Sequence, residues 1–200
     1  MQRFGWNRLY VLIREIILTT ISADGTPHIA PMGVHVAADH LRILPFKPSI
    51  TLDNLLATGS AVINRVDDVR VFAGCVTGRQ RDWPLTASTR VAAPRLVSAP
   101  GHTEVELFRV EEDPVRPVLY CHSVHEAERQ AFAGFNRAQF SVLEAAILVT
   151  RLNRLPRAKV DSELAYLAIG LEKTAGPAER EAWGWLLDAV TRFYQTGVAS

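Results

Sequence analysis

The chain has 200 residues, of which 48% are hydrophobic and 22% charged, and its formal net charge is +1 at pH 7. This composition excludes a disordered chain, and the length accommodates one medium domain or a larger and a smaller one. The lack of a basic excess argues against nucleic acid as the main partner. Two cysteines, Cys75 and Cys121, are too few for a disulfide framework. The first ten residues lack the apolar core of a secretory signal, and no apolar stretch reaches membrane-spanning length, so we expect a cytoplasmic protein that binds no membrane.

The beginning of the chain has the pattern of a β-hairpin. Residues 10–22 are rich in Ile, Leu, Val and Thr, which suit a strand. Asp24-Gly25 is a turn signal, because this dipeptide readily adopts positive φ. Residues 27–38 are therefore predicted to form the second strand of the hairpin.

Short strand-like segments continue to residue 124. Beyond the hairpin, further strands are predicted at 41–45, 61–64, 69–75, 104–111 and 116–124. A helix over 48–57, ended by Gly59, is predicted between them, and residues 76–100 are interpreted as a loop with some short helix. Six or seven strands with hairpin connections and one early helix indicate an antiparallel barrel rather than a βαβ sheet.

The pattern becomes helical after residue 125. Apolar residues recur at helical spacing in 137–154 and 160–171, and Gly176-Pro177 opens a third helical segment. Three amphipathic helices can bury their apolar faces against one another or against the barrel. We therefore predict an α+β fold with a barrel domain over 1–125 and a helical domain over 126–200.

A group of polar residues stands where a predicted strand leads into the early helix. Lys47, Ser49, Thr51 and Asn54 supply a cation, two hydroxyls and an amide within eight residues. A helix N-terminus with such side chains can bind a phosphate. The alternative is a capped helix, with Ser49 as the N-cap and Lys47 solvated. Spacing alone favours the cap.

The second candidate segment is His28–Val34, where a predicted strand contains Pro31 and Gly33. Such a strand loses part of its hydrogen-bond ladder, which leaves backbone groups free to hold a flavin ring. The alternative is a β-bulge that only bends the strand, and spacing alone favours the bulge.

Other chemistry has little support in the sequence. Cys121 and His122 point to opposite faces of a strand, so at most two of Cys121, His122 and His125 can share a metal, and we predict no metal site. The usual signatures of hydrolases, nucleotide triphosphatases and dinucleotide-binding folds are absent.

Four segments of the chain together resemble one known family. The segments TTISADGTPHIAPMGV and LPFKPSITLDNLLATGSAVINRVDDVRVFA resemble the DUF447 family of FMN-binding split-barrel proteins. The segments GFNRAQFSVLEAAILVTRL and LEKTAGPAEREAW are similar to the helical C-terminal part of that family. The resemblance implies a six-stranded split barrel, a homodimer, and FMN near the dimer interface.

The resemblance also changes the preferred interpretation of both candidate segments, from a cap and a bulge to parts of an FMN site. It implies that helix-entry hydroxyls and a nearby cation hold the FMN phosphate, while the strand Ala30–Val34 runs beside the isoalloxazine ring. His28 stands where a polar residue such as Asn is expected in relatives, which puts one ring contact in doubt. The predicted cofactor-binding residues are Ala30, Pro31, Met32, Gly33, Phe46, Lys47, Ser49, Thr51 and Asn54.

The function expected from this resemblance is that of a flavin-dependent oxidoreductase of unknown substrate. FMN carries the redox chemistry, so no catalytic side chain is predicted. The alternative is a non-catalytic flavin carrier, sensor or assembly factor, with a possible link to pterin-dependent one-carbon metabolism. Some other split barrels bind haem, deazaflavin or pyridoxal-type cofactors, and this third interpretation stays open.

Overall fold

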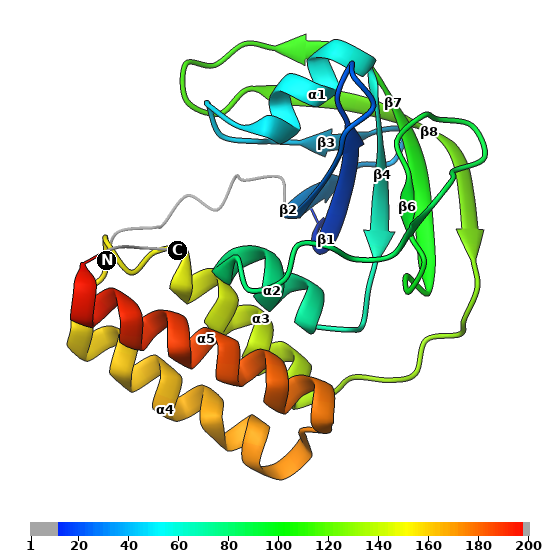
Figure 1. The fold of residues 1–200 in the computed structure, drawn as a ribbon. Coiled ribbons are helices and arrows are strands. Elements are labelled where there is room, and N and C mark those ends of the chain that lie inside the picture. Colours follow the sequence, from blue (N-terminus) through cyan, green and yellow to red (C-terminus); the bar gives the residue numbers. More distant parts are fainter. Residues whose placement is uncertain (1–11, 198–200) are drawn as a thin grey trace, which may run out of the picture.

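The computed structural model describes residues 12–197, in which a six-stranded barrel lies beside a layer of helices (Figure 1). The strands are antiparallel and close in the order β1-β2-β3-β8-β7-β4. Their bounds are β1 Leu12–Ile21, β2 Pro27–Val36, β3 Leu41–Ile43, β4 Ser60–Arg65, β7 Gly101–Glu111 and β8 Val118–Glu128. The predicted α+β split-barrel class is confirmed. The predictions for residues 1–11 lie outside the described residues.

The interior of the barrel is filled by alternate residues of its strands. Ile16 and Leu18 of β1, Val34 of β2 and Ile63 of β4 are almost fully buried in one cluster, as the two-residue period of a strand requires. Helix α1 (Ile50–Thr58) covers one end of the barrel and adds Leu52 and Leu55 to this cluster.

The helix predicted over 48–57 is present as α1, with Ser49 and Gly59 as its caps. The Ser49 hydroxyl accepts a hydrogen bond from the backbone N–H of Leu52 at 3.3 Å. Gly59 ends the helix at φ 70°, a left-handed conformation that glycine adopts without steric cost. Both caps are the residue types that the sequence pattern indicates.

One predicted strand, 69–75, is wrong, because this segment is helix α2 (Arg70–Thr77). Its apolar residues are buried on both sides: Val69 and Ala73 join the helical core, while Phe72 and Cys75 pack toward the barrel. A continuous apolar run of this length does not distinguish a buried strand from a buried helix by periodicity. Gly78, at φ 66°, ends the helix.

The segment 76–100 contains no helix beyond the last turn of α2, and the expected short helix is therefore wrong. It forms a small two-stranded sheet from β5 (Leu85–Thr86) and β6 (Arg95–Leu96). The side chain of Asn64 on β4 fixes this segment to the barrel, because its Oδ1 accepts the backbone N–H of Leu96 at 2.8 Å. Leu96 and Trp83 are buried with α2 in a second cluster on the outer face of the barrel.

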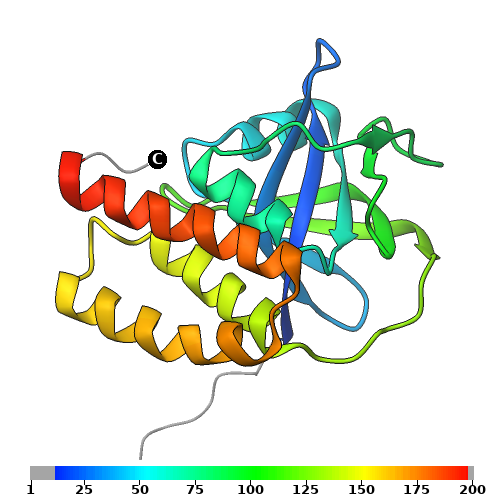
Figure 2. The ribbon, with the colours of Figure 1, turned by 60° about the horizontal axis from the view of Figure 1, so that its bottom comes forward.

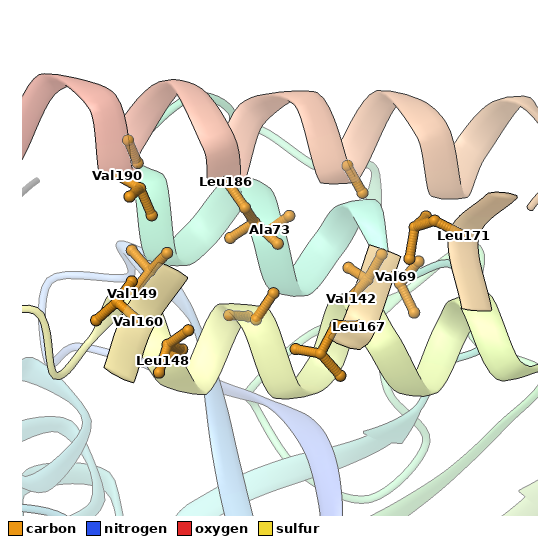
Figure 3. Packing of buried hydrophobic residues seen from close by; sticks show 14 of the residues in the cluster. Val69, Ala73, Val142, Leu148, Val149, Val160, Leu167, Leu171, Leu186 and Val190 are labelled. Carbon is orange, nitrogen blue, oxygen red and sulfur yellow. The ribbon is translucent and has the colours of Figure 1, made fainter. Parts of the chain in front are cut away.

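The three predicted C-terminal helices are present: α3 and α5 pack against α2, and α4 packs against α3 on the outer side of the layer (Figure 2). They are α3 (Arg137–Val149), α4 (Arg157–Thr174) and α5 (Pro177–Thr196). Figure 3 shows their common core, in which Leu186 of α5 points toward Ala73 of α2 and both are fully buried. Helix α2 therefore links the helical layer to the barrel.

The described helices also bear on membranes and on the domain division. Within residues 12–197, none of them combines the length and apolar character that a membrane-spanning helix needs. Strand β8 continues through Glu128, and the division into 1–125 and 126–200 stays a prediction.

Candidate functional site

Strands β2 and β3 are neighbours in the closed barrel, but they separate beyond a short pairing, and the opening between them is called the split. These strands pair only over Val34–Val36, and the last pair is Val34 with Ile43. Residues 30–33 pair with β1 on one side. Within the described part of the chain, no strand pairs with their other edge. The β1–β2 register runs without a shift, so Pro31 and Gly33 do not mark a β-bulge. Backbone groups along this edge are free of a ladder, as the flavin-ring hypothesis requires.

The segment 44–49 leaves the sheet at this split and leads into α1. Because Ile43 is opposite Val34, the chain departs directly beside Gly33. The two predicted segments, Ala30–Gly33 and Phe46–Asn54, therefore lie on either side of the same opening. All nine predicted cofactor-binding residues belong to these two segments.

The first turns of α1 carry the predicted hydroxyls and amide. Ser49 acts as the N-cap, so the capping alternative describes what its hydroxyl does in this structure. Thr51 and Asn54 are 3% and 5% exposed. The Asn54 side chain donates to the hydroxyl of Thr20 at 3.0 Å, and Thr20 is opposite His28 at the start of β2. Asn54 thus connects α1 to the hairpin end of the split.

Lys47 and Phe46 are exposed and contact the loop between β7 and β8. The ammonium of Lys47 lies 2.8 Å from a carboxylate oxygen of Glu112. The Lys47 N–H donates to the carbonyl of Val115 at 2.9 Å. Arg116 donates to the carbonyl of Leu44 at 2.9 Å, and its guanidinium lies 4.9 Å from the centre of the Phe46 ring. These contacts fix the segment beside the split.

A group of basic residues that the sequence analysis does not identify lies on the same side of the barrel. Arg42 on β3 stands between His35 on β2 and Tyr120 on β8 in the strand register. Burial, and then the charges of Arg42 and Arg116, lower the pKa of His35. The Nε of Arg42 is buried and has no hydrogen-bond partner among the described residues. Arg42, Arg116 and Lys47 together place positive charge beside the split, and this charge favours binding of an anion.

A further cation, Arg81, lies near His28 at the opposite end of the split. Burial, and then the charge of Arg81, lower the pKa of His28, which favours its neutral form. Arg81 belongs to the segment 76–100, which the sequence analysis interprets as a loop with some short helix. It lies close enough to His28 to affect its titration. His28 is half-buried at the start of β2 and can still offer a ring nitrogen to a ligand.

A separate cavity of about 750 Å³ opens at the other end of the barrel from α1. Its lining includes Ile16, Val34 and Ile63 and the polar residues Arg14, Arg65 and Glu126. Arg65 forms ion pairs with Glu126 at 3.2 Å and with Glu128. None of the nine predicted residues lines this cavity. Cation and carboxylate charges are mixed there, which makes it a weaker candidate for an anionic cofactor than the split.

The two cysteines have the character of core residues. Burial raises the pKa of Cys75 to about 11 and that of Cys121 to about 12. A thiol with such a pKa is protonated at neutral pH and is a poor nucleophile. Cys121 faces the barrel interior, whereas His122 stacks on Phe108 outside it with ring centres 3.9 Å apart. The predicted alternation of these two residues is confirmed.

Comparison with known families and structures is consistent with the fold and with the resemblance found in the sequence. Residues 14–130 match the model described as "Protein of unknown function (DUF447) N-terminal domain", and residues 136–188 match "Protein of unknown function (DUF447)". The chain therefore belongs to the DUF447 family. No curated protein matches it.

Solved structures share the fold at low sequence identity. An FMN-bound DUF447 protein from Methanosarcina mazei superposes with a TM-score of 0.76 at 21% identity, covering 88% of this chain and 94% of that one. The flavin reductase component of a bacterial two-component tryptophan halogenase has a TM-score of 0.51 at 14% identity, covering 60% and 82%. Flavoredoxin from Methanosarcina acetivorans has a TM-score of 0.50 at 14% identity, covering 64% and 74%.

Proposed function

We propose that this protein binds FMN at the split between β2 and β3 and acts as a flavin-dependent oxidoreductase. The observation that carries the proposal is the geometry of the split. A free strand edge, a helix N-terminus and several cations meet there. A flavin mononucleotide needs these partners, because its ring accepts and donates hydrogen bonds in a plane and its phosphate carries negative charge. The FMN-bound protein from Methanosarcina mazei, of the same family, supports the choice of ligand.

The parts of the ligand are assigned to the two segments as follows. Ala30, Pro31, Met32 and Gly33 contact the isoalloxazine ring through their backbone. Lys47, Ser49, Thr51 and Asn54 surround the phosphate, with Phe46 beside them. Ser49 and Lys47 already have partners within the chain. To bind the phosphate, the Ser49 hydroxyl has to donate its own hydrogen to a phosphate oxygen while it still accepts the N–H of Leu52. Lys47 has to exchange its ion pair with Glu112 for one with the phosphate.

In such a protein the chain's residues bind and orient the cofactor. FMN supplies hydride or electron transfer when bound. The free edge of β2 fixes the plane of the ring, and the helix N-terminus holds the phosphate. Arg42 and Arg116 add positive charge on the same side of the barrel. The structure gives no reason to assign a proton transfer to a side chain, and the substrate stays open.

We propose further that the protein is a cytoplasmic homodimer. Phe46, Ile50 and Val115 are 56%, 57% and 58% exposed at the split. Exposed large apolar residues beside an open strand edge favour coverage by a second copy. Light scattering on the purified chain is expected to give twice its mass. The two unpaired, buried cysteines suit a reducing compartment.

The experiment that tests the oxidoreductase proposal is anaerobic reduction of the FMN-loaded protein. NADH or NADPH is expected to bleach the flavin absorbance near 450 nm, and an added acceptor is expected to restore it. Dithionite provides the fully reduced reference. FMN that stays bound and oxidised with both nucleotides would contradict a nicotinamide-dependent reductase and favour a carrier or sensor.

A further inference from the structure

A second group of chemically active side chains lies on the outer face of β7 and β8, away from the split. It consists of His102 and Glu104 of β7 and His125 of β8. One nitrogen or oxygen atom from each of the three residues lies within 4.8 Å of those of the other two. His102 is 3% exposed, Glu104 is fully buried, and His125 is half-buried. The proposed FMN site uses none of them.

The strand register explains how these residues meet. His102 and Glu104 are two positions apart on β7 and therefore share a face. Glu104 is directly opposite His125, whereas Val105 is opposite Ser123, so Val124 is an extra residue in β8. This β-bulge places His125 on the outer face of the barrel. His122, three positions earlier in β8, lies on the same face. Bulges often direct a side chain at a functional site.

His102 has an unusual environment for a buried histidine. Neither of its ring nitrogens makes a hydrogen bond to any of the described residues. Its Nε2 faces a carboxylate oxygen of Glu104 at 3.4 Å, and its ring centre lies 5.8 Å from that of His125. Buried polar groups are generally paired. A ligand that accepts a nitrogen lone pair would satisfy one of the two ring nitrogens.

Glu104 is held rigidly with its carboxylate toward the two histidines. One of its oxygens accepts the backbone N–H of Thr89 at 2.7 Å, and the other accepts those of Arg90 and Val91 at 2.6 and 3.2 Å. Carboxylates that bind metals are commonly supported by such additional hydrogen bonds. The same contacts tie the loop over the site, so the carboxylate is already oriented before any ligand arrives.

We propose that His102, Glu104 and His125 bind a divalent transition-metal ion of the zinc class. Two imidazoles and one carboxylate form a donor set used by zinc and by non-haem iron. Three protein donors leave at least one coordination position for water or another small ligand. His125, which is partly accessible, gives the ion a route from solvent. The charge of Arg95 lies within electrostatic reach of His102 and Glu104 and opposes a cation, whereas the Glu104 carboxylate favours one.

Formation of the site requires a small closure. Metal–nitrogen distances of about 2.0–2.1 Å bring tetrahedral donors to about 3.4 Å from one another. The three donors, now within 4.8 Å, must therefore approach by about an ångström. His102 and Glu104 already lie 3.4 Å apart, so the half-buried His125 side chain is the one that has to move.

The test is zinc binding by the full chain, freed of affinity tag and treated with chelator. Titration against a chromophoric zinc indicator is expected to show one tight equivalent per chain. His102→Gln and His125→Gln are each expected to weaken zinc binding by at least about 100-fold, since even changes behind the ligands cost 10–100-fold. His122→Gln is the matched control, because His122 lies on the same strand and face but outside the group, and its affinity is expected to stay at the unmodified value.

Two results would overturn the proposal. One is a chain that binds no zinc in competition with a micromolar indicator. The other is a His125→Gln variant that binds zinc as tightly as the His122→Gln control. His125 is half-buried, so its variant gives a readable result even where the buried His102 variant fails to fold. Far-UV circular dichroism of each variant establishes that the chain is folded before titration.

Discussion

Replacing both Ser49 and Thr51 with alanine is expected to increase the dissociation constant of FMN. The expected increase lies between roughly 30-fold and more than 10,000-fold. The reason is the loss of two hydroxyl hydrogen bonds to a charged phosphate, at roughly 1–3 kcal/mol each. The fold is expected to survive, because loss of the Ser49 cap of α1 costs only about 1 kcal/mol. Isothermal titration with FMN measures the effect.

Riboflavin separates the phosphate contribution from other causes. It has the same ring as FMN but no phosphate, so the double variant is expected to bind riboflavin as the unmodified chain does. Thr58→Ala is the matched control, because Thr58 lies at the other end of α1, where its hydroxyl donates to the carbonyl of Asn54 at 2.9 Å. Unchanged FMN affinity in the double variant would refute the phosphate assignment. Equal weakening of FMN and riboflavin would point to altered folding instead.

Replacing Leu186 with alanine is expected to lower the free energy of unfolding by about 2–5 kcal/mol. Leu186 is fully buried where α5 meets α2, and truncation leaves a cavity between the helical layer and the helix that joins it to the barrel (Figure 3). Leu187 is the adjacent residue of the same type and is 37% exposed. Its alanine variant is expected to lose less than about 1 kcal/mol.

Urea denaturation followed by circular dichroism and by tryptophan fluorescence compares the two variants. Because α2 packs on both the barrel and the helices, we expect the two signals to change together in a single transition. Similar losses for Leu186→Ala and Leu187→Ala would contradict the packing described here. Two separated transitions would show instead that the barrel and the helices unfold independently.

Much of the fold could be predicted from the sequence because local signals agree with it. Gly25 adopts φ 88° in the β1–β2 turn, as the Asp-Gly pair predicts. Gly59 ends α1 and Pro177 begins α5, each in its preferred position. Where local pattern and tertiary burial differ, the prediction fails. Residues 69–75 are buried on both sides, which hides the helical period of α2.

Part of the candidate site could likewise be predicted from the sequence, and part could not. The segments Ala30–Gly33 and Phe46–Asn54 could be proposed from the chain because each contains its own local pattern. Arg42 and Arg116 could not, since their charges approach the split only through strand pairing and loop packing. The group of His102, Glu104 and His125 is hidden for a related reason. The bulge at Val124 changes the alternation on which the sequence argument depends.

The most direct test of the account is an absorption spectrum of the purified protein after incubation with FMN and removal of free ligand. We expect the two visible bands of oxidised flavin, near 375 and 450 nm, at about one FMN per chain, and we expect the Ser49→Ala/Thr51→Ala variant to lose them. A protein that remains colourless after reconstitution would contradict FMN binding at the split. The fold would stand, and the cavity at the other end of the barrel would become the leading candidate site.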